Sequence, residues 1–434
     1  MKQWTVMVYL AGDNNLDSAG VADLGEMKKV GSTDDINVVA QFDRRGNDIG
    51  TARYYLRAGT TLKADMIGAS LGETDDGDPK ALESFIRWAM KSYPAKRYLV
   101  VLWNHGNGWD DTDVYAGERS RFSLARRGRV LVKPKRRALA EVPIADASRM
   151  LARPMRRAFF VTSAQKALAA GARSEAKMRG ILYDDNAKDF LDNVEMKGVL
   201  QSVSKSLRRK IDIVGMDACL MSMAEVAYQI RDSAAFVVGS EQTEPGEGWP
   251  YDDVLAALAK TPSMAPADFA KTIVRKYLAS YGANAGVTQA ACDLSRTPKL
   301  YSAISALGRA LSAGLKNERT LATILRVRGQ VQSYETADNV DLCDLCNLLV
   351  GALGKASPIA RACKKVLAAV SGAGGVVIEH GGKGRSVANS NGIAIYFPTG
   401  AVSPLYANLD FAKKSGWSRF IAAYVAAVQR RPRG

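Results

Sequence analysis

The sequence predicts an α/β fold built around a mostly parallel sheet. Over the first half of the chain, short apolar runs alternate with segments of helical periodicity, the rhythm of strand–helix–strand units. Two runs, at 98–103 and 211–216, are strongly apolar and end in polar residues, as expected of strands buried on both faces. From about Thr297 helical stretches dominate, so a largely helical C-terminal region is expected after the sheet.

The first part of the chain, residues 1–117, starts with a strand at 4–10, a helix through Leu24 and Met27, and a strand at 36–42. Asp78-Pro79 predicts a helix start, because Asp caps the first turn and Pro suits its first position. Five apolar residues then follow the spacing of one buried helix face: Leu82, Phe85, Ile86, Ala89 and Met90. The strand that reaches His105 comes next.

The alternation breaks between 118 and 180 and then resumes. The expected strands lie at about 181–184, 211–219, 235–241 and 287–294, with a helix from Leu220 to Arg231 after the second of them. Two late strands are expected at 375–379 and 392–397. The predicted divisions of the chain are therefore 1–117, 118–180, 181–295 and 296–434.

The bulk composition indicates an ordinary globular protein. With 434 residues, 47% of them hydrophobic, the chain can bury one large core and a second, smaller one. No apolar run is long enough to span a membrane, and five cysteines, an odd number, argue against a disulfide framework. The N-terminus is strand-like and not a secretory leader, so the expected location is the cytoplasm, or outside the cell if a leader was left off.

Two reactive residues stand at strand ends. His105 and Cys219 each follow an apolar run, and the carboxyl ends of parallel strands meet at one edge of a sheet. A Cys and a His brought together by the fold are a candidate nucleophile and base. The N–H groups of Gly106 and of Cys219 itself are candidate donors to an oxyanion. A helix beginning at Cys219 is also expected to lower the pKa of its thiol.

Asp217 lies two residues before Cys219 and shares its side-chain direction in a strand. Asp217 is either a cap for the following helix or a carboxylate at a pocket floor that pairs with a substrate Arg or Lys. The loop at 241–251 adds Glu241, Glu244 and Glu247 at the same sheet edge. This loop is either solvated or, given its Gly and Trp residues, a shaped pocket wall.

Three further motifs are interpreted as structural. Cys343 and Cys346 form a CxxC without a second pair and lie inside a helical pattern, which disfavours a metal site. His380 is expected in a loop between the late strands. Asp13 ends the first strand together with two asparagines and either borders the site or, as interpreted here, has only a turn role.

The basic charge of the chain is concentrated in one segment. The net charge is +16, and residues 119–179 alone carry 17 Lys or Arg against three acids. The rest of the chain therefore carries only about +2.

Several motifs together resemble one protein family. The stretch 102–109, LWNHGNGW, and the stretch 217–221, DACLM, look like the two active-site blocks of the clostripain-like cysteine peptidases. Further matching motifs follow in order along the chain: 77–79, 183–185, 225–228, 244–251 and 395–398. The resemblance implies a caspase-like three-layer sandwich with a mostly parallel central sheet. It also implies a His/Cys dyad and cleavage after Arg or Lys.

In that family Cys219 would attack the scissile carbonyl, His105 would protonate the leaving amine, and Asp217 would select the basic residue. Glu247 is carried over as a second pocket acid, although no obvious motif fixes its position in this sequence. The expected partners are protein or peptide substrates, and nucleic acid is not expected. No metal ligand or cofactor is predicted; some members need calcium, but no aspartate cluster here has recognisable ligand spacing, so calcium binding stays open.

The basic insertion, 118–180, lies between the His105 strand and the Cys219 strand, where family members are often cut by their own activity. A segment rich in Arg and Lys suits an Arg/Lys-specific site, so the insertion is interpreted as an activation linker. Two alternatives stay open. It is a solvated insertion without a role, or it is a polyanion-binding arm of a non-catalytic caspase-like protein.

Overall fold

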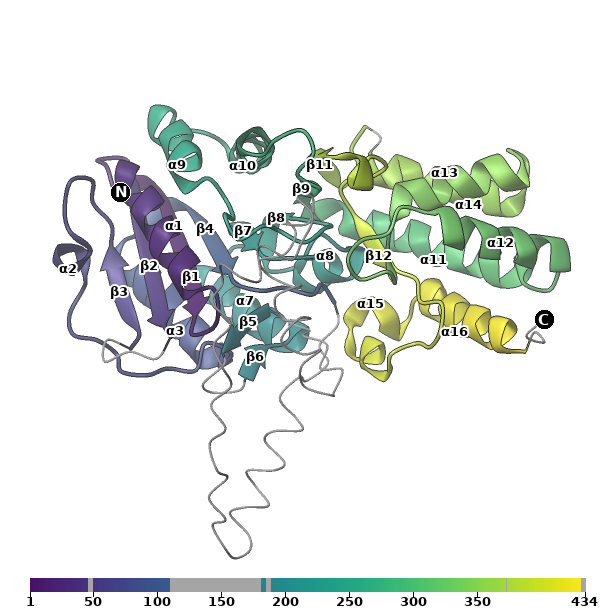
Figure 1. Ribbon diagram of the computed structural model, residues 1–434, viewed down its shortest axis with the longest axis horizontal. Coiled ribbons are helices and arrows are strands. Elements are labelled where there is room, and N and C mark those ends of the chain that lie inside the picture. Colours follow the sequence, from purple (N-terminus) through teal and green to yellow (C-terminus); the bar gives the residue numbers. More distant parts are fainter. Residues whose placement is uncertain (46–49, 110–180, 185–188, 372, 431–434) are drawn as a thin grey trace, which may run out of the picture.

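An eight-stranded sheet forms the centre of the molecule in the computed structural model, which describes residues 1–45, 50–109, 181–184, 189–371 and 373–430 (Figure 1). The spatial order of its strands is β11-β9-β8-β7-β4-β1-β2-β3. Their bounds are β1 Lys2–Gly12, β2 Ile36–Arg44, β3 Ala52–Tyr55, β4 Ala95–Trp103, β7 Ile211–Asp217, β8 Ala234–Gly239, β9 Val287–Asp293 and β11 Val377–Lys383.

The five central strands run parallel, which confirms the predicted mostly parallel sheet. β1 pairs with β2 and β4, and β7 pairs with β4 and β8, all in parallel. The outer pairings are antiparallel: β2–β3, β8–β9 and β9–β11. Nearly every residue of β1, β4 and β7 is buried, because helices cover both faces of the sheet.

Helices pack in two layers around the sheet (Figure 1). One layer contains α1 Asp17–Val30, α9 Tyr251–Lys260 and α10 Pro266–Ser280; the other contains α3 Pro79–Ser92, α7 Asn193–Leu207 and α8 Ala224–Ile230. The predicted start of α3 is confirmed, since the Asp78 side chain accepts a hydrogen bond from the Lys80 N–H and Pro79 occupies the first position. Of its five predicted core residues, Met90 is only half-buried.

The C-terminal region is mainly helical, as predicted, and lies beside the sheet (Figure 1). Its longer helices are α11 Thr297–Gly314, α12 Glu318–Gln330, α13 Leu342–Leu353, α14 Pro358–Val370 and α16 Gly416–Gln429. The short helices α2 Leu62–Asp65 and α15 Asp410–Lys413 complete the helical set among the described residues. Two small two-stranded sheets complete the strands: β5 Ile181–Asp184 with β6 Asp189–Leu191, and β10 Asn339–Asp341 with β12 Ala394–Tyr396.

The sheet extends beyond residue 295, the end predicted for the second part of the caspase-like region. The first late strand is β11, which pairs with β9 at the edge of the sheet. His380 consequently lies within β11, exposed, and not in a loop as expected. Buried hydrophobic residues form one continuous cluster from β1 to α16, so the expected second core is not a separate one.

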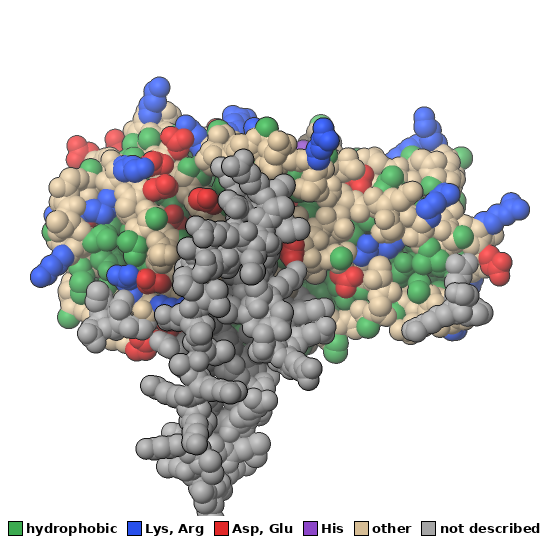
Figure 2. Space-filling model, in the orientation of Figure 1, with side chains coloured by type: hydrophobic (Ala, Val, Ile, Leu, Met, Phe, Trp, Pro, Cys, Tyr) green, Lys and Arg blue, Asp and Glu red, His purple; other side chains and the backbone are tan. Residues whose placement is uncertain are grey.

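Acidic and basic side chains are interspersed over the described part of the face seen in Figure 2. The segment that carries most of the basic charge, 119–179, lies outside the described residues. Among the residues that are described, no helix combines the length and the apolar composition needed to cross a bilayer.

Candidate active site

His105 and Cys219 emerge at the same edge of the sheet from the neighbouring strands β4 and β7. In the parallel register Trp103 lies opposite Asp217, so each reactive residue stands two positions beyond a paired residue. The Asn104 N–H donates to the Asp217 carbonyl (3.3 Å) and continues the pairing by one step. The structure therefore brings the two predicted residues together at the carboxyl edge of the sheet.

The segment after Cys219 is not the predicted helix. Leu220 adopts a left-handed conformation (φ 64°), Met223 forms a parallel bridge with Ala394, and α8 starts only at Ala224. The Ser222 backbone pairs outside any helix, since its N–H donates to the Ser240 carbonyl (2.8 Å) and its carbonyl accepts from the Ala394 N–H (2.9 Å). The expectation that a helix beginning at Cys219 lowers the thiol pKa is therefore wrong.

The thiol of Cys219 is buried and is surrounded by backbone N–H groups. Burial raises its pKa to about 11, although N–H groups of Glu244, Gly106 and Cys219 itself favour the thiolate. The Glu244 N–H reaches the sulfur at 3.3 Å. The two donors predicted for an oxyanion, Gly106 and Cys219, thus both lie beside the sulfur.

Gly106 lies against the backbone of Cys219. A Cβ atom at Gly106 would lie 2.5 Å from the Cys219 carbonyl oxygen and 2.9 Å from the Ala218 Cβ. Gly106 also forms an antiparallel bridge with Ile181, the first residue of β5. Only a glycine allows this close approach, so the position of its N–H beside the sulfur depends on the missing side chain.

His105 is buried as well, and burial lowers the pKa of its imidazole to about 4. Its Nε2 lies 2.8 Å from Oδ1 of Asn15, which follows β1. The sequence did not single out Asn15 as a partner of His105. The predicted turn role applies to Asn14, whose side chain bonds the Ala11 carbonyl (2.9 Å) and the Leu16 N–H (2.8 Å).

A small pocket opens next to Cys219. Its lining includes Trp103, Asn104, Asp217, Cys219, Glu244 and Gly248. Asp217 is buried at the pocket wall, where its Oδ2 accepts hydrogen bonds from the Tyr251 hydroxyl (2.8 Å) and the Trp249 N–H (3.3 Å). The Asp217 carboxylate also hydrogen-bonds the Glu244 side chain.

Glu244, and not Glu247, is the second carboxylate of this pocket. Glu247 is exposed and lines a neighbouring pocket with Glu26 and Tyr281. Burial raises the pKa of Glu244 well above its usual range, and the nearby Asp217 charge raises it further. Burial also raises the pKa of Asp217. Burial and mutual repulsion thus both disfavour two negative charges at this position.

Gly248 and Gly215 determine the path of the 241–251 loop, which carries Glu244. Gly248 has a φ of 52°, and a Cβ there would lie 3.1 Å from both Asp217 oxygens. Gly215 of β7 leaves room for the Trp249 ring, which a Cβ would approach to 2.8 Å. The loop therefore folds down onto β7 and presents Glu244 beside Asp217. The interpretation of the 241–251 loop as a pocket wall agrees with this geometry.

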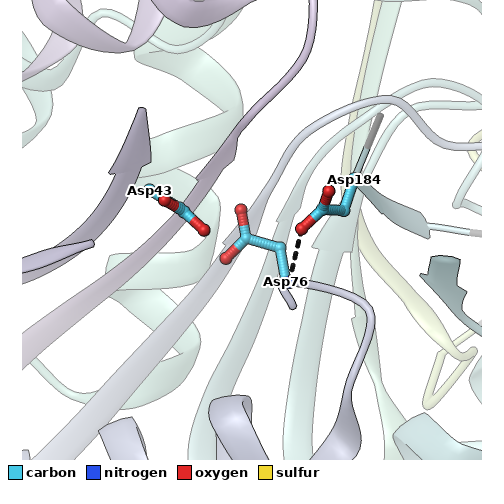
Figure 3. Close-up of side chains that lie close together, drawn as sticks. All are labelled: Asp43, Asp76 and Asp184. Carbon is cyan, nitrogen blue, oxygen red and sulfur yellow. Dashed lines mark hydrogen bonds between the residues drawn. The ribbon is translucent and has the colours of Figure 1, made fainter. Parts of the chain in front are cut away.

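The cysteines of the CxxC motif lie away from the surface. Cys343 and Cys346 are both buried in α13, the latter beside Cys363 of α14. The one group of His, Cys, Asp or Glu side chains with metal-binding geometry among the described residues is Asp43, Asp76 and Asp184 (Figure 3).

Comparison with known proteins agrees with this arrangement. The chain is 25% identical to clostripain from Hathewaya histolytica over 277 residues, which are 58% of this chain but only 41% of the clostripain sequence. A secreted cysteine protease from Bacteroides thetaiotaomicron, solved with an irreversible peptide inhibitor, has the same fold (TM-score 0.59, 19% identity). The match covers 97% of this chain and 99% of that one.

An inactive zymogen from Parabacteroides distasonis is similarly related in fold (TM-score 0.61, 18% identity, covering 95% of this chain and 98% of that one). The clostripain family model matches residues 8–121 and 168–424 and leaves out the middle of the basic insertion. With most of its length matched in this way, the chain belongs to the clostripain family.

Proposed function

We propose that the protein is a cysteine endopeptidase that cleaves peptide bonds after Arg or Lys. The observation that carries the proposal is the pair of buried carboxylates, Asp217 and Glu244, in a pocket that Cys219 also lines. A cationic side chain that enters this pocket would meet two acids. It would neutralise a charge that burial otherwise makes costly.

In the proposed reaction the thiol proton of Cys219 moves to His105, and the sulfur bonds to the scissile carbonyl carbon. The carbonyl oxygen then carries negative charge and accepts hydrogen bonds from the N–H groups of Gly106 and Cys219. His105 next gives its proton to the leaving amine as the peptide bond breaks. Water hydrolyses the resulting thioester and releases the carboxyl product and the free thiol.

The closed site holds both reacting groups in their neutral forms at neutral pH. A thiol with a pKa of about 11 beside an imidazole with a pKa of about 4 is a weak nucleophile beside a weak base. Both shifts come mainly from burial, so opening the site to water or substrate would reduce them. This arrangement supports synthesis as a latent precursor.

The specificity test compares fluorogenic peptides that differ only in the residue before the cut. We expect Arg and Lys substrates to be cleaved and matched Gln and Leu substrates to be cleaved at least about 100-fold more slowly, because these lack the charge that pairs with the two acids. Equal cleavage of the Gln peptide would exclude the proposed pocket.

Two variants assign the pocket residues. Asp217→Asn should lower kcat/KM for the Arg peptide by roughly 30-fold or more, because it removes one partner of a buried charge pair. Glu244→Gln should act in the same direction, whereas the exposed Asp34→Asn serves as a matched control without effect. A larger loss from Glu247→Gln than from Glu244→Gln would mean that the second acid is misassigned.

The alternative of a non-catalytic, polyanion-binding protein finds no support in the relatives, two of which are described as proteases. The basic insertion on which it depends lies outside the described residues.

A further inference from the structure

Outside the basic insertion, charge is divided unevenly between the C-terminal region and the rest of the chain. Residues 296–434 carry 19 Lys or Arg against 7 Asp or Glu, a net charge of +12. Residues 1–118 and 180–295, which supply most of the sheet, carry 24 Lys or Arg against 34 Asp or Glu, a net charge of −10. The small net charge outside the insertion therefore results from two large and opposite contributions.

Three helices of the C-terminal region contain no acidic residue: α11, α14 and α16. They are neighbours, because α11 packs against both α14 and α16, which lie on either side of it (Figure 1). Each helix has exposed basic side chains. Six of these residues form what is here named the basic surface: Lys299 and Arg309 of α11, Arg361, Lys364 and Lys365 of α14, and Arg419 of α16.

Helical periodicity explains why the outer sides of these helices can carry so much charge. In α11 the buried residues Leu300, Ile304, Leu307 and Leu311 recur every three or four positions and face the core, so their burial stabilises the helix. The exposed positions among the basic residues hold small side chains: Ser302, Ala313, Ala368, Ala422 and Ala426. The surface is therefore basic and has no protruding apolar groups.

The side chains of the basic surface have no acidic partners. Among the described residues, none of the six takes part in an ion pair, whereas Lys413 nearby in the sequence pairs with Asp410 at 3.2 Å. Arg309 donates to the Ser305 hydroxyl (3.0 Å), which is a neutral acceptor. Unpaired like charges repel one another, so a partner that neutralises them would be bound favourably.

The composition of this surface disfavours partners that need apolar or aromatic contacts. The exposed large apolar side chains among the described residues are Met1, Ile67, Leu71 and Val194, all outside the three helices. The aromatic rings of the three helices are buried or half-buried. Specific protein interfaces rely on aromatic anchors, and single-stranded nucleic acids stack on exposed rings. Neither kind of partner fits this surface.

We propose that the basic surface binds the headgroups of an anionic lipid bilayer. A bilayer presents many negative charges in one plane, and it attracts nearby Lys and Arg residues through electrostatics alone. The three helices provide the breadth for such a contact, since α11 has 18 residues and is about 27 Å long, and packed helices lie about 8–10 Å apart. A nucleic-acid duplex would follow one line of charges and leave much of this breadth unused.

The opposite charge of the other parts of the chain would orient the bound molecule. Residues 1–118 and 180–295 are acidic overall and would be repelled by the same bilayer. The C-terminal region lies beside the sheet, so the protein would attach by that end (Figure 1). Because no apolar residue inserts, salt would reverse the attachment.

Vesicle sedimentation tests the proposal on the full chain carrying Cys219→Ala, so that self-cleavage does not interfere. We expect binding to vesicles with about 30 mol% phosphatidylglycerol in about 50 mM NaCl, release in about 500 mM NaCl, and no binding to pure phosphatidylcholine. Absence of binding to the anionic vesicles at low salt, or equal binding to neutral ones, would overturn the proposal.

The basic insertion also attracts anions, so two variants that lose the same charge locate the contact. The surface variant carries Arg361→Gln, Lys364→Gln, Lys365→Gln and Arg419→Gln, and the matched insertion variant carries Arg126→Gln, Arg127→Gln, Lys135→Gln and Arg136→Gln. We expect the surface variant to bind anionic vesicles at least about 10-fold more weakly than the insertion variant, with an unchanged Tm. Equal affinities, or weaker binding by the insertion variant, would overturn the proposal.

The same two variants distinguish a bilayer from a nucleic acid. If the surface variant loses affinity for a random-sequence DNA duplex but not for vesicles, the partner is a nucleic acid and the proposed bilayer contact is wrong. The proposal does not depend on peptidase activity. A chain that binds vesicles as expected but cleaves no peptide would disprove only the proposed function.

Discussion

At the scale of single residues, the candidate site depends on backbone groups as much as on side chains. The sulfur of Cys219 is approached by N–H groups from Gly106 and Glu244, which come from different loops. Gly106 reaches that position because it has no Cβ atom, which would collide with the Cys219 backbone. Small changes at this glycine should therefore alter chemistry more than folding.

Gly106→Ala tests this point. The added Cβ would lie 2.5 Å from the Cys219 carbonyl oxygen, so Gly106 must move away from the sulfur. Loss of one oxyanion donor costs about 100-fold to 1,000-fold in kcat, and we expect a loss of that order with the Arg peptide.

The matched control for that experiment is Gly198→Ala in α7, where a Cβ meets nothing within 4 Å. It should leave kcat unchanged and stabilise the protein by about 0.5–1 kcal/mol, because alanine favours the helix. Full activity in Gly106→Ala would show that this N–H is not a donor in the transition state.

The sequence predicted those site residues that end strands. His105, Asp217 and Cys219 follow buried apolar runs, and a parallel sheet brings such ends together. Asn15 and Glu244 lie in loops, and Tyr251 starts α9 directly after a loop. The path of a loop depends on contacts made elsewhere. Glu244 reaches Asp217 only because Gly248 and Trp249 turn the loop onto β7. No local pattern distinguishes Glu244 from Glu247.

At the scale of secondary-structure elements, a pair of buried acids joins the sheet to the C-terminal region. Glu241 follows β8 and accepts hydrogen bonds from the Tyr334 hydroxyl (2.8 Å) and the Gly392 N–H (2.8 Å). Asp341 caps α13 and hydrogen-bonds the Glu241 carboxyl. Burial and the charge of Asp341 raise the pKa of Glu241 well above its usual range, which favours a protonated Glu241 carboxyl.

This pair predicts a pH dependence of stability. A raised folded-state pKa means that the folded protein binds the proton more tightly than the unfolded chain. The contribution to stability is complete below the ordinary Glu pKa and decreases as the pH rises above it. In Glu241→Gln the amide donates to Asp341 at every pH and removes that dependence.

We therefore expect the free energy of unfolding of Glu241→Gln to gain about 1 kcal/mol or more relative to its parent between pH 5 and pH 8. Denaturant unfolding of both proteins in the Cys219→Ala background measures this difference. The exposed Asp34→Asn should show no such trend. A constant difference across the pH range would mean that the Glu241 carboxyl is not protonated.

Element types were easier to predict than their directions and ends. The helices and buried strands followed from periodicity, but strand direction depends on where the chain returns to the sheet. β9 runs antiparallel to β8, and β11 runs antiparallel to β9, although helices separate each of these strands from the one before it. The helix after Cys219 begins late because Met223 bridges to Ala394, a residue 171 positions later in the sequence.

At the scale of the whole molecule, the basic insertion separates two halves of one sheet. Residues before it supply β1, β2, β3 and β4, and residues after it supply β7, β8, β9 and β11. The halves meet where β4 pairs with β7, which is where His105 and Cys219 emerge. Cleavage of the insertion would therefore leave the sheet pairing intact.

The proposed self-processing is tested on the intact chain. Wild-type protein should be recovered as two fragments cut after an Arg or Lys within 119–180, because this segment combines many target residues with a position between the catalytic strands. Cys219→Ala should remain a single chain of 46.7 kDa. Mass spectrometry of both proteins purified in parallel measures this. An inactive variant that is cut at the same bond, with host proteases inhibited, would show that another enzyme does the processing.

The pairing of β4 with β7 has a consequence for the stability of the cleaved protein. Each half of the sheet carries one of the two reactive residues, so neither fragment alone would have the proposed activity. If the proposed cut occurs, the proposed activity would need a complex of the two polypeptides, which no disulfide links among the described residues. The cleaved enzyme is in effect a heterodimer encoded by one reading frame. Conditions that separate the two polypeptides would then end the proposed activity without chemical damage to either of them.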